Sequence, residues 1–321
     1  MSIWSYILKR ILQGIPIIII VSFISFFLIR LSPVDPLAEL RMNPSITKQT
    51  LEAEKIRLGL DKPVIVQYFI WGKNFIRGDM GTTVSGERVS AKIKERAFNT
   101  LLLSLSVIFW TWIIGIPLGI IAALNYRSTF DRILTVVSSI GMAIPSFFFA
   151  ILLLIFAQKS GLFPIGGLTC PNFSDMDFTH KILDIAHHLF LPTVVLTTIS
   201  LAGLSRQMRS NLLDVLDSDY VKFARAKGLP PSKVIIKHAL RNAINPLVTL
   251  LGFEFAALLS GAALTEYVFQ YPGLGRLILE AVMKSDINLV MASLIIGSFM
   301  LIAGNILSDI LLKLTDPRVR L

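Results

Sequence analysis

The sequence predicts an all-α integral membrane protein with six transmembrane helices and both termini on the cytoplasmic side. Of its 321 residues, 54% are hydrophobic and 16% are charged, whereas about a quarter of the residues in a soluble domain are charged. The apolar residues form long runs, and the basic residues gather in short segments between them. Membrane topology therefore explains the net charge of +10 better than nucleic-acid binding does.

Six of the apolar runs are long enough, or nearly long enough, to cross about 30 Å of hydrocarbon as helices. They cover residues 11–29, 97–126, 133–158, 185–205, 246–268 and 287–308. No small-residue cleavage site follows the first run, so we interpret it as an uncleaved span and not as a signal peptide. The chain then divides into the N-terminus with the first span (1–30), an extracytoplasmic segment (31–96) and a transmembrane core (97–321).

The distribution of Lys and Arg predicts the orientation, because short cytoplasmic loops carry an excess of these residues. With the N-terminus inside, the cytoplasmic segments include Lys9, Arg10 and the strongly basic stretch 206–241. The short outer loops then contain few basic residues, namely Lys159, Lys181, Arg276 and Lys284. The segment 31–96 is also basic, but long segments are exempt from the rule. We expect a multi-pass protein with both termini inside.

The extracytoplasmic segment is large enough to form a small subdomain. Residues 45–58 predict a polar helix, and residues 64–77 (VIVQYFIWGKNFIR) place aromatic and aliphatic side chains at helical spacing. A helix with such a face lies either on the outer membrane surface or against the spans. The sequence does not distinguish these two positions.

The loop between the fourth and fifth spans, 213–245, is basic and helical. An apolar stripe predicts that the fourth span continues into the cytoplasm as an amphipathic helix, and it consists of Leu212, Leu216, Tyr220 and Phe223. Gly228 can adopt the left-handed conformation that ends a helix, and the two prolines that follow delay the next one. We expect a second helix with Ser232 as its N-cap, and Pro246 at the start of the fifth span.

Two functions fit this helical hairpin. A basic loop can simply contact lipid headgroups. The residues at its tip, however, are small (Ala224, Ala226 and Gly228), which favours a short rigid helix that another protein approaches closely and binds in a groove.

The sequence contains no motif of a known enzyme class. It has no phosphate-binding glycine loop, no zinc-binding His-Glu-x-x-His and no dinucleotide-binding glycine pattern. Cys170 is the only cysteine, and the neighbouring His187 and His188 would point about 100° apart on a helix, which makes a poor chelating pair. We predict no catalytic residues, no metal site and no cofactor on this chain.

Two carboxylates, Glu254 and Glu266, interrupt the otherwise apolar fifth span. Glu254 lies about 12 Å along a helix from Pro246, hence well within the membrane. An intramembrane carboxylate commonly faces a cavity or a partner chain, and a hydrogen-bonded packing role is an equal alternative. We take both as candidate pore or gate residues. A secondary transporter with an ion site at Glu254 is a rival, but it would need internal symmetry that the sequence does not show. A membrane enzyme would need more polar residues within the spans.

Several short motifs carry a family resemblance. They are LGLDKP at 58–63, GDMG at 78–81, AIPSF at 143–147, LFPIGG at 162–167, HLFLP at 188–192, TEYVFQYPGLG at 265–275 and DPR at 316–318. With these motifs the chain resembles, over nearly its whole length, the membrane-spanning permease subunits of binding-protein-dependent ABC importers. The similarity is to the B-type subunit of the dipeptide, oligopeptide and nickel group. It implies a type I ABC importer permease fold in a bacterial cytoplasmic (inner) membrane.

The loop 213–245 is similar to the cytoplasmic EAA loop of that family. Its general form fits at Ala224, Gly228 and Leu240, whereas the peptide-group variant, DYxxxARAKGL followed by HALRNA, fits almost throughout. In the family this loop is the coupling helix that docks into a groove of a cytoplasmic ATPase. The resemblance thus assigns ATPase coupling to Asp219, Tyr220, Phe223, Ala224, Arg225, Ala226, Lys227, Gly228 and Leu229.

The resemblance also implies partners for a chain that lacks an ATP site. These are a second, C-type permease subunit, two ATP-binding cytoplasmic subunits that hold ATP and Mg, an extracytoplasmic substrate-binding protein and the lipid bilayer; no nucleic acid is expected. The implied function is the translocation pore of an ATP-driven importer that works by alternating access. Di- or oligopeptides are the expected cargo, and nickel, other metal chelates and glutathione are alternatives within the group.

Overall fold

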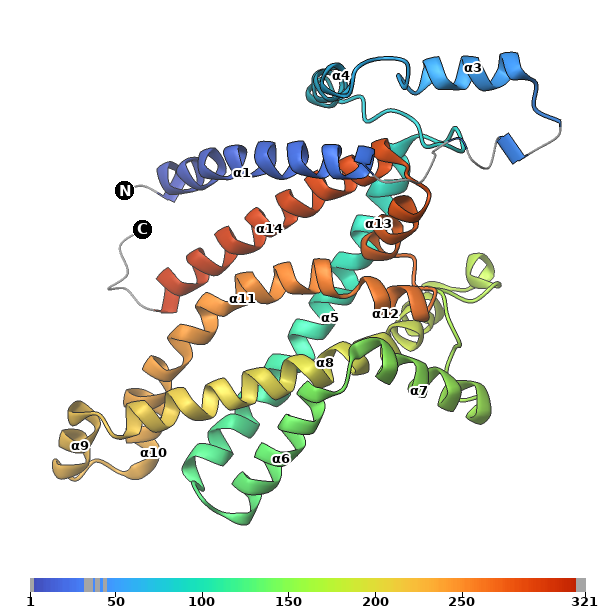
Figure 1. The fold of residues 1–321 in the computed structure, drawn as a ribbon. Coiled ribbons are helices and arrows are strands. Elements are labelled where there is room, and N and C mark those ends of the chain that lie inside the picture. The colour runs from blue at the N-terminus through green and yellow to red at the C-terminus, as the bar shows by residue number, and fades with distance from the viewer. Residues whose placement is uncertain (1–2, 32–36, 38–40, 43–44, 316–321) are drawn as a thin grey trace.

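The computed structural model describes residues 3–31, 37, 41–42 and 45–315 of the chain. Within them the structure is predominantly helical, and its long helices run between the two ends of the molecule (Figure 1). The DPR motif at 316–318 lies outside the described residues. This architecture confirms the predicted all-α fold class.

Four of the described helices are long and apolar enough to cross a membrane. They are α1 (Ile3–Leu31), α5 (Val89–Leu124), α8 (Phe178–Leu216) and α14 (Ile287–Thr315). They contain the first, second, fourth and sixth predicted spans. α5 packs extensively against α8, and α14 packs against both α1 and α11 (Arg241–Gly261).

The third predicted span is a bent pair of helices, α6 (Thr129–Ala143) and α7 (Ser146–Ser160), which meet at 95°. Pro145 causes the break, because proline has no backbone N–H and disfavours a helical conformation of the residue before it. Ile144 is accordingly extended, with ψ of 122°. The structure therefore corrects the expected continuous span to a bent pair of helices, which forms either one broken crossing or a re-entrant segment.

The fifth predicted span is also interrupted. α11 ends at Gly261, and α12 (Ala263–Val268) follows it after one residue. Pro246 lies inside α11 and not at its start, which corrects the expected boundary. Among the described residues, α11 is not one of the helices that meet the criterion of length and hydropathy, so the total of six crossings and the orientation stay predictions.

The segment predicted to be extracytoplasmic contains the two expected helices, α3 (Lys48–Arg57) and α4 (Val64–Ile76). Trp71 of α4 is buried against Phe26 of α1, whereas Phe69 on the other side of α4 is 66% exposed. α4 thus packs against the first span and presents an apolar side to its surroundings, which combines the two alternatives left open by the sequence.

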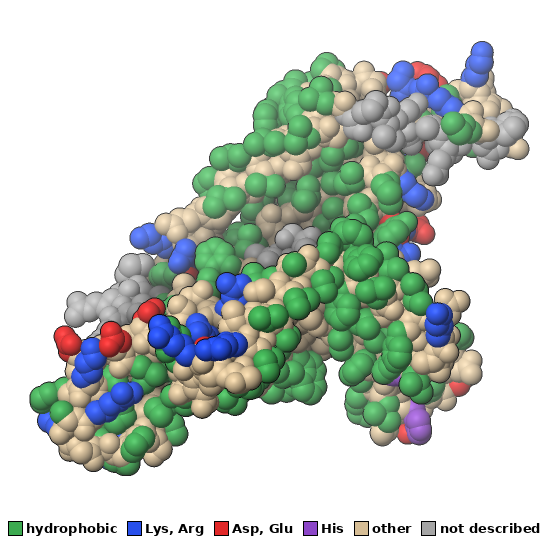
Figure 2. Space-filling view, turned by 60° about the horizontal axis from the view of Figure 1, so that its bottom comes forward, with side chains coloured by type: hydrophobic (Ala, Val, Ile, Leu, Met, Phe, Trp, Pro, Cys, Tyr) green, Lys and Arg blue, Asp and Glu red, His purple; other side chains and the backbone are tan. Residues whose placement is uncertain are grey.

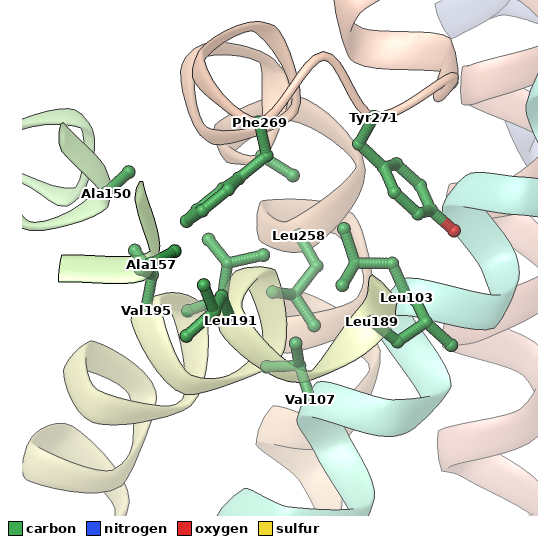
Figure 3. Packing of buried hydrophobic residues seen from close by; sticks show 12 residues of the cluster. Leu103, Val107, Ala150, Ala157, Leu189, Leu191, Val195, Leu258, Phe269 and Tyr271 are labelled. Carbon is green, nitrogen blue, oxygen red and sulfur yellow. The ribbon is translucent and has the colours of Figure 1, made fainter. Parts of the chain in front are cut away.

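One buried cluster joins the membrane helices to the segment after α12 (Figure 3). Leu103 comes from α5, Leu191 from α8 and Leu258 from α11, and Phe269 points into the same cluster. The hydroxyl of Tyr271 donates to the Asn99 carbonyl of α5 at 2.7 Å. The segment after α12 is therefore anchored on the bundle.

Figure 2 shows a broad hydrophobic surface, with most of the charged side chains gathered toward two ends of the molecule. Exposed large apolar side chains occur along α1, α5, α6 and α7. This distribution suits a protein whose middle is surrounded by lipid and whose ends are in water.

Candidate functional site

The end of the molecule that the sequence predicts to be cytoplasmic is built on an extension of α8 (Figure 1). α8 has 39 residues and is about 58 Å long at 1.5 Å per residue, nearly twice the roughly 30 Å of the hydrocarbon core. Two short helices, α9 (Asp219–Ala226) and α10 (Pro231–Lys233), follow before the chain returns to the bundle. The structure confirms that the fourth span continues into a helical hairpin.

The hairpin turns at Gly228, whose φ is +76° as the sequence predicts. A Cβ added to Gly228 would meet nothing within 4 Å, so the backbone conformation alone favours glycine. The second helix starts at Pro231 with Pro230 as N-cap, and not after Ser232 as expected, because proline suits the first helical position. It continues as a π-helical segment, η2 (Val234–Leu240), directly into α11.

One face of α9 is buried inside the hairpin. Val221 is 0% exposed and Ala224 is 7% exposed, and both belong to a small apolar core with Leu212, Val234 and Ala239. Ala224 therefore contacts its own chain. This corrects the expectation that its small size serves the close approach of a partner.

The rest of the α9 surface is exposed. We use the name docking face for the part of it that consists of Asp219, Tyr220, Phe223, Ala226 and Lys227. Phe223 is 62% exposed and Tyr220 is 44% exposed, so neither continues the buried stripe of α8, because the chain changes direction between the two helices. The Lys227 ammonium lies 4.7 Å from the centre of the Phe223 ring. Of the other residues expected to couple, Arg225 is exposed and Leu229 is half-buried.

A partly buried ion pair, not identified from the sequence, joins α8 to the start of α6. Arg209 donates from Nε to Asp131 Oδ1 (2.5 Å) and from Nη2 to Asp131 Oδ2 (2.8 Å). Asp131 is 3% exposed and also accepts from the Arg127 backbone N–H at 3.0 Å. The two side chains are 78 residues apart in the sequence, so no local pattern relates them. The pair fixes the loop between α5 and α6 to the helix that carries the hairpin.

Glu266 is fully buried, and both of its carboxylate oxygens accept hydrogen bonds. Thr100 Oγ1 donates to Oε1 at 2.8 Å, and the Arg276 backbone N–H donates to Oε2 at 2.8 Å. Arg276 lies in the first turn of α13 (Leu274–Met283), where a carboxylate complements the positive end of the helix dipole. This environment favours a capping role for Glu266 over the pore or gate role expected from the sequence.

Close packing explains the two glycines of the TEYVFQYPGLG motif. A Cβ on Gly273 would lie 2.2 Å from the carboxyl carbon of Glu266, and a Cβ on Gly275 would lie 2.9 Å from the Cα of Ala263. Both glycines are therefore required by close approach. The motif describes a packed corner between α12 and α13.

Glu254 of α11 accepts a hydrogen bond from Trp112 Nε1 of α5 at 3.0 Å. The contact joins two neighbouring helices, as the packing alternative expects. Because Glu254 is partly exposed, it stays a candidate for the pathway.

An apolar groove of about 640 Å³ lies between α5, α6 and α8. Its described lining is uncharged and includes the hydroxyl groups of Ser106, Thr193 and Thr197. The first two lie 3.1 Å apart, and Thr197 Oγ1 is buried without a hydrogen-bond partner in the described part of the chain. Scattered hydroxyl residues on apolar helices give no distinctive pattern, so the sequence did not reveal this groove.

The described residues contain no group of three His, Cys, Asp or Glu side chains that could hold a metal ion. His187 Nε2 lies 2.9 Å from the Leu162 carbonyl, and His188 Nδ1 lies 2.9 Å from the Asp184 carbonyl. Local hydrogen bonds thus account for both rings.

A bundle of long apolar helices with an exposed hairpin at one end defines the chain as a helical membrane protein. The chain matches the family described as binding-protein-dependent transport system inner membrane component over residues 115–321. Residues 3–98 match the N-terminal part described for the membrane component of such systems. The chain therefore belongs to this family of importer permeases and is a multi-pass protein of the inner membrane.

Similar proteins extend the match over nearly the whole chain. The oligopeptide transport system permease protein AppB of Bacillus subtilis is 38% identical over 98% of this chain and 99% of its own length. The di/tripeptide transport system permease protein DppB of Pseudomonas aeruginosa is 36% identical over 98% of both chains. A putative peptide permease protein of Brucella suis is 37% identical, also over 98% of both.

Proposed function

We propose that this chain forms, with a second permease subunit, the translocation pathway of an ATP-driven importer of di- or oligopeptides. Two cytoplasmic ATPases would bind ATP and Mg, and an extracytoplasmic binding protein would deliver the cargo. The names of the similar permeases support the cargo class. The uncharged groove between α5, α6 and α8 also suits peptides of varied sequence, because apolar walls and hydroxyl groups do not select for one charged side chain.

The docking face of α9 is the observation that carries this proposal. Exposed aromatic rings beside a lysine on a short helix are typical of surfaces that enter a groove on another protein. The opposite face of α9 is fixed by the core that contains Val221 and Ala224. A partner that moves α9 would therefore move the whole hairpin as one body.

The hairpin is connected to the membrane helices in a way that supports coupling. α8 continues without a break from the hairpin to the bundle, and the Asp131–Arg209 pair connects it to α6. α6 and α8 both line the groove. Movement of the ATPases would thus tilt two walls of the groove together, as alternating access requires. Glu254 is engaged by Trp112, which gives an ion-driven mechanism less support.

Site-directed cross-linking of the assembled importer tests the docking. In a Cys170→Ser background, Phe223→Cys labelled with a thiol-reactive photo-cross-linker should link to an ATPase subunit on illumination. Lys159→Cys is the control, because Lys159 is exposed in the last turn of α7, which lies far from α9 (Figure 1). Equal linking at both positions, or none at Phe223→Cys in a complex that hydrolyses ATP, would contradict the proposed docking.

A further inference from the structure

The chain between the hairpin and the fifth predicted span is irregular, and the proposed function gives this irregularity no role. η2 is a π-helix of seven residues, whereas π-helices are rare, usually span a single turn and are frequent at functional sites. Pro246 follows inside α11 and lacks the N–H that would bond the Asn242 carbonyl. Helices bend at both kinds of irregularity, so a movement of α9 would be absorbed here unless something bridges the segment.

Asn242, in the first turn of α11, forms such a bridge. Its Nδ2 donates to the Tyr220 hydroxyl of α9 at 2.8 Å and to the His238 carbonyl of η2 at 3.3 Å. One side-chain amide carries the two hydrogens that these bonds require. Within the described part of the chain, no other side-chain hydrogen bond joins α9 to α11. A single side chain thus connects the docking face, the π-helix and the start of the fifth predicted span.

The packing of the hairpin places this bridge in the path of any movement of α9. α9 packs more extensively against η2 than against α8, and Val221 of α9 and Val234 of η2 belong to the same buried core. Asn211 of α8 donates to the Ala243 carbonyl at 3.2 Å, next to Asn242. The first turn of α11 is therefore held from α8 and from α9, and a displaced docking face would act on it directly.

α11 leads from Asn242 to the third wall of the groove. Glu254 lies about 18 Å further along the helix, at 1.5 Å per residue, and accepts from Trp112 Nε1 of α5 at 3.0 Å. α5 lines the groove together with α6 and α8. The connection through α8 and the Asp131–Arg209 pair involves the other two walls. A movement of α11 would thus act on α5.

We propose that Asn242 is a positioning residue for the coupling of ATP hydrolysis to transport. It transmits the movement of the docking face to α11 across η2, and α11 transmits it to α5 through the contact between Glu254 and Trp112. All three walls of the groove then move with the ATPases. This inference rests on the proposed function, because without a partner at the docking face Asn242 would only stabilise the hairpin.

The amount of peptide transported per ATP hydrolysed by the reconstituted importer tests this role. Asn242→Ala removes both hydrogen bonds, and Tyr220→Phe removes the bond to the hydroxyl while it keeps the aromatic ring on the docking face. Each variant should lower transport per ATP by roughly two- to tenfold, the range that one hydrogen bond of ordinary strength allows. The double variant should lose no more than the more severe single variant, because both changes break the same link.

Two controls separate coupling from stability and from surface charge. The photo-cross-link from Phe223→Cys to an ATPase should keep its yield when Asn242→Ala is added, whereas a loosened hairpin would lower docking or assembly. Lys237→Ala should keep the transport per ATP of the unmodified chain, because Lys237 is exposed on η2 and forms no hydrogen bond with α9 in the described part of the chain.

Three outcomes would overturn the inference while the proposed function stands. They are unchanged transport per ATP in assembled Asn242→Ala, additive losses in the double variant, and an equal loss in Lys237→Ala, which would assign the effect to surface charge. If Asn242→Ala does not assemble, Tyr220→Phe decides alone, and normal coupling in that variant contradicts the inference. Absence of ATP-dependent uptake by the unmodified chain is a different result, because it contradicts the proposed function and the inference with it.

Discussion

At the residue scale, a substitution of Gly228 changes the backbone conformation without creating a side-chain clash. Its φ is +76°, and a Cβ there would meet nothing within 4 Å. Gly228→Val should therefore act through the left-handed conformation alone, at a cost of about 1–2 kcal/mol or more for a β-branched residue. Asparagine tolerates this conformation, so Gly228→Asn is the matched control.

We expect Gly228→Val to reduce ATP-dependent peptide uptake by the reconstituted importer several-fold, and Gly228→Asn to retain most of it. Both variants should still insert and pair with the second permease, because the turn lies outside the bundle. If the two variants transport equally well, the turn angle does not matter for coupling.

The close contact between Gly273 and Glu266 gives a second prediction at this scale. The Cβ of Gly273→Ala would overlap the buried carboxyl group, and overpacking of this kind commonly costs about 1–3 kcal/mol. The variant should show a lower thermal unfolding temperature and a lower yield of assembled complex. Gly72→Ala is the control, because a Cβ on Gly72 would meet nothing within 4 Å. Equal stability of the two variants would contradict the capping role of Glu266.

At the element scale, the Asp131–Arg209 pair should matter for coupling as well as for stability. Asp131→Asn leaves the Arg209 charge without its partner, and because Arg209 is partly exposed, solvent lowers the cost below the roughly 3–5 kcal/mol of a fully buried pair. We expect Asp131→Asn to lower the amount of peptide transported per ATP hydrolysed, because α6 would no longer follow α8.

Exchanging the two charges of the Asp131–Arg209 pair provides the control. The double variant Asp131→Arg with Arg209→Asp should recover part of the transport per ATP that each single change loses. Normal coupling in Asp131→Asn at normal assembly would show that the pair only stabilises the loop.

The elements also show which features of the fold depend on local chemistry. The sequence predicts the helices of the outer segment, the continuation of α8 and the turn at Gly228, because helical spacing and glycine or proline positions determine them locally. It misses the 95° bend at Pro145, because a proline allows a break but the surrounding packing sets its angle. It also misses the inward direction of Ala224, which depends on contacts with Val234 and Ala239 across the hairpin.

In the candidate site, too, local patterns can be predicted from the sequence and long-range contacts cannot. The hairpin proposed for coupling could be predicted because its motif is contiguous, whereas the Asp131–Arg209 pair and the hydroxyl-lined groove join residues that are far apart in the chain. Glu266 was noticed as a carboxylate in an apolar run, but its role depends on the backbone N–H of Arg276 and on Thr100. Long-range packing determines such roles, and the local patterns of a single sequence do not predict that packing.

At the scale of the whole molecule, the orientation is open to a direct test with Cys170. It lies in the loop between α7 and α8, which the distribution of basic residues places outside, and its side chain is partly exposed. A membrane-impermeant thiol reagent should label it in intact spheroplasts. Ser232→Cys in a Cys170→Ser background is the inside control and should react after permeabilisation alone.

The opposite labelling pattern would reverse the orientation. A denatured sample is needed to show that Cys170 reacts when it is fully accessible. The cytoplasmic position of the docking face depends on this result.

The central claim is that ATPases acting through the docking face drive peptide import, and uptake into proteoliposomes tests it most directly. With the complete importer in the membrane, the binding protein and peptide outside and ATP inside, the unmodified chain should accumulate peptide. Phe223→Ala should lower that uptake at least tenfold while the complex stays assembled. An imposed proton or sodium gradient without ATP should drive no uptake in either case. Accumulation driven by a gradient alone, or full ATP-dependent uptake by Phe223→Ala, would contradict this account.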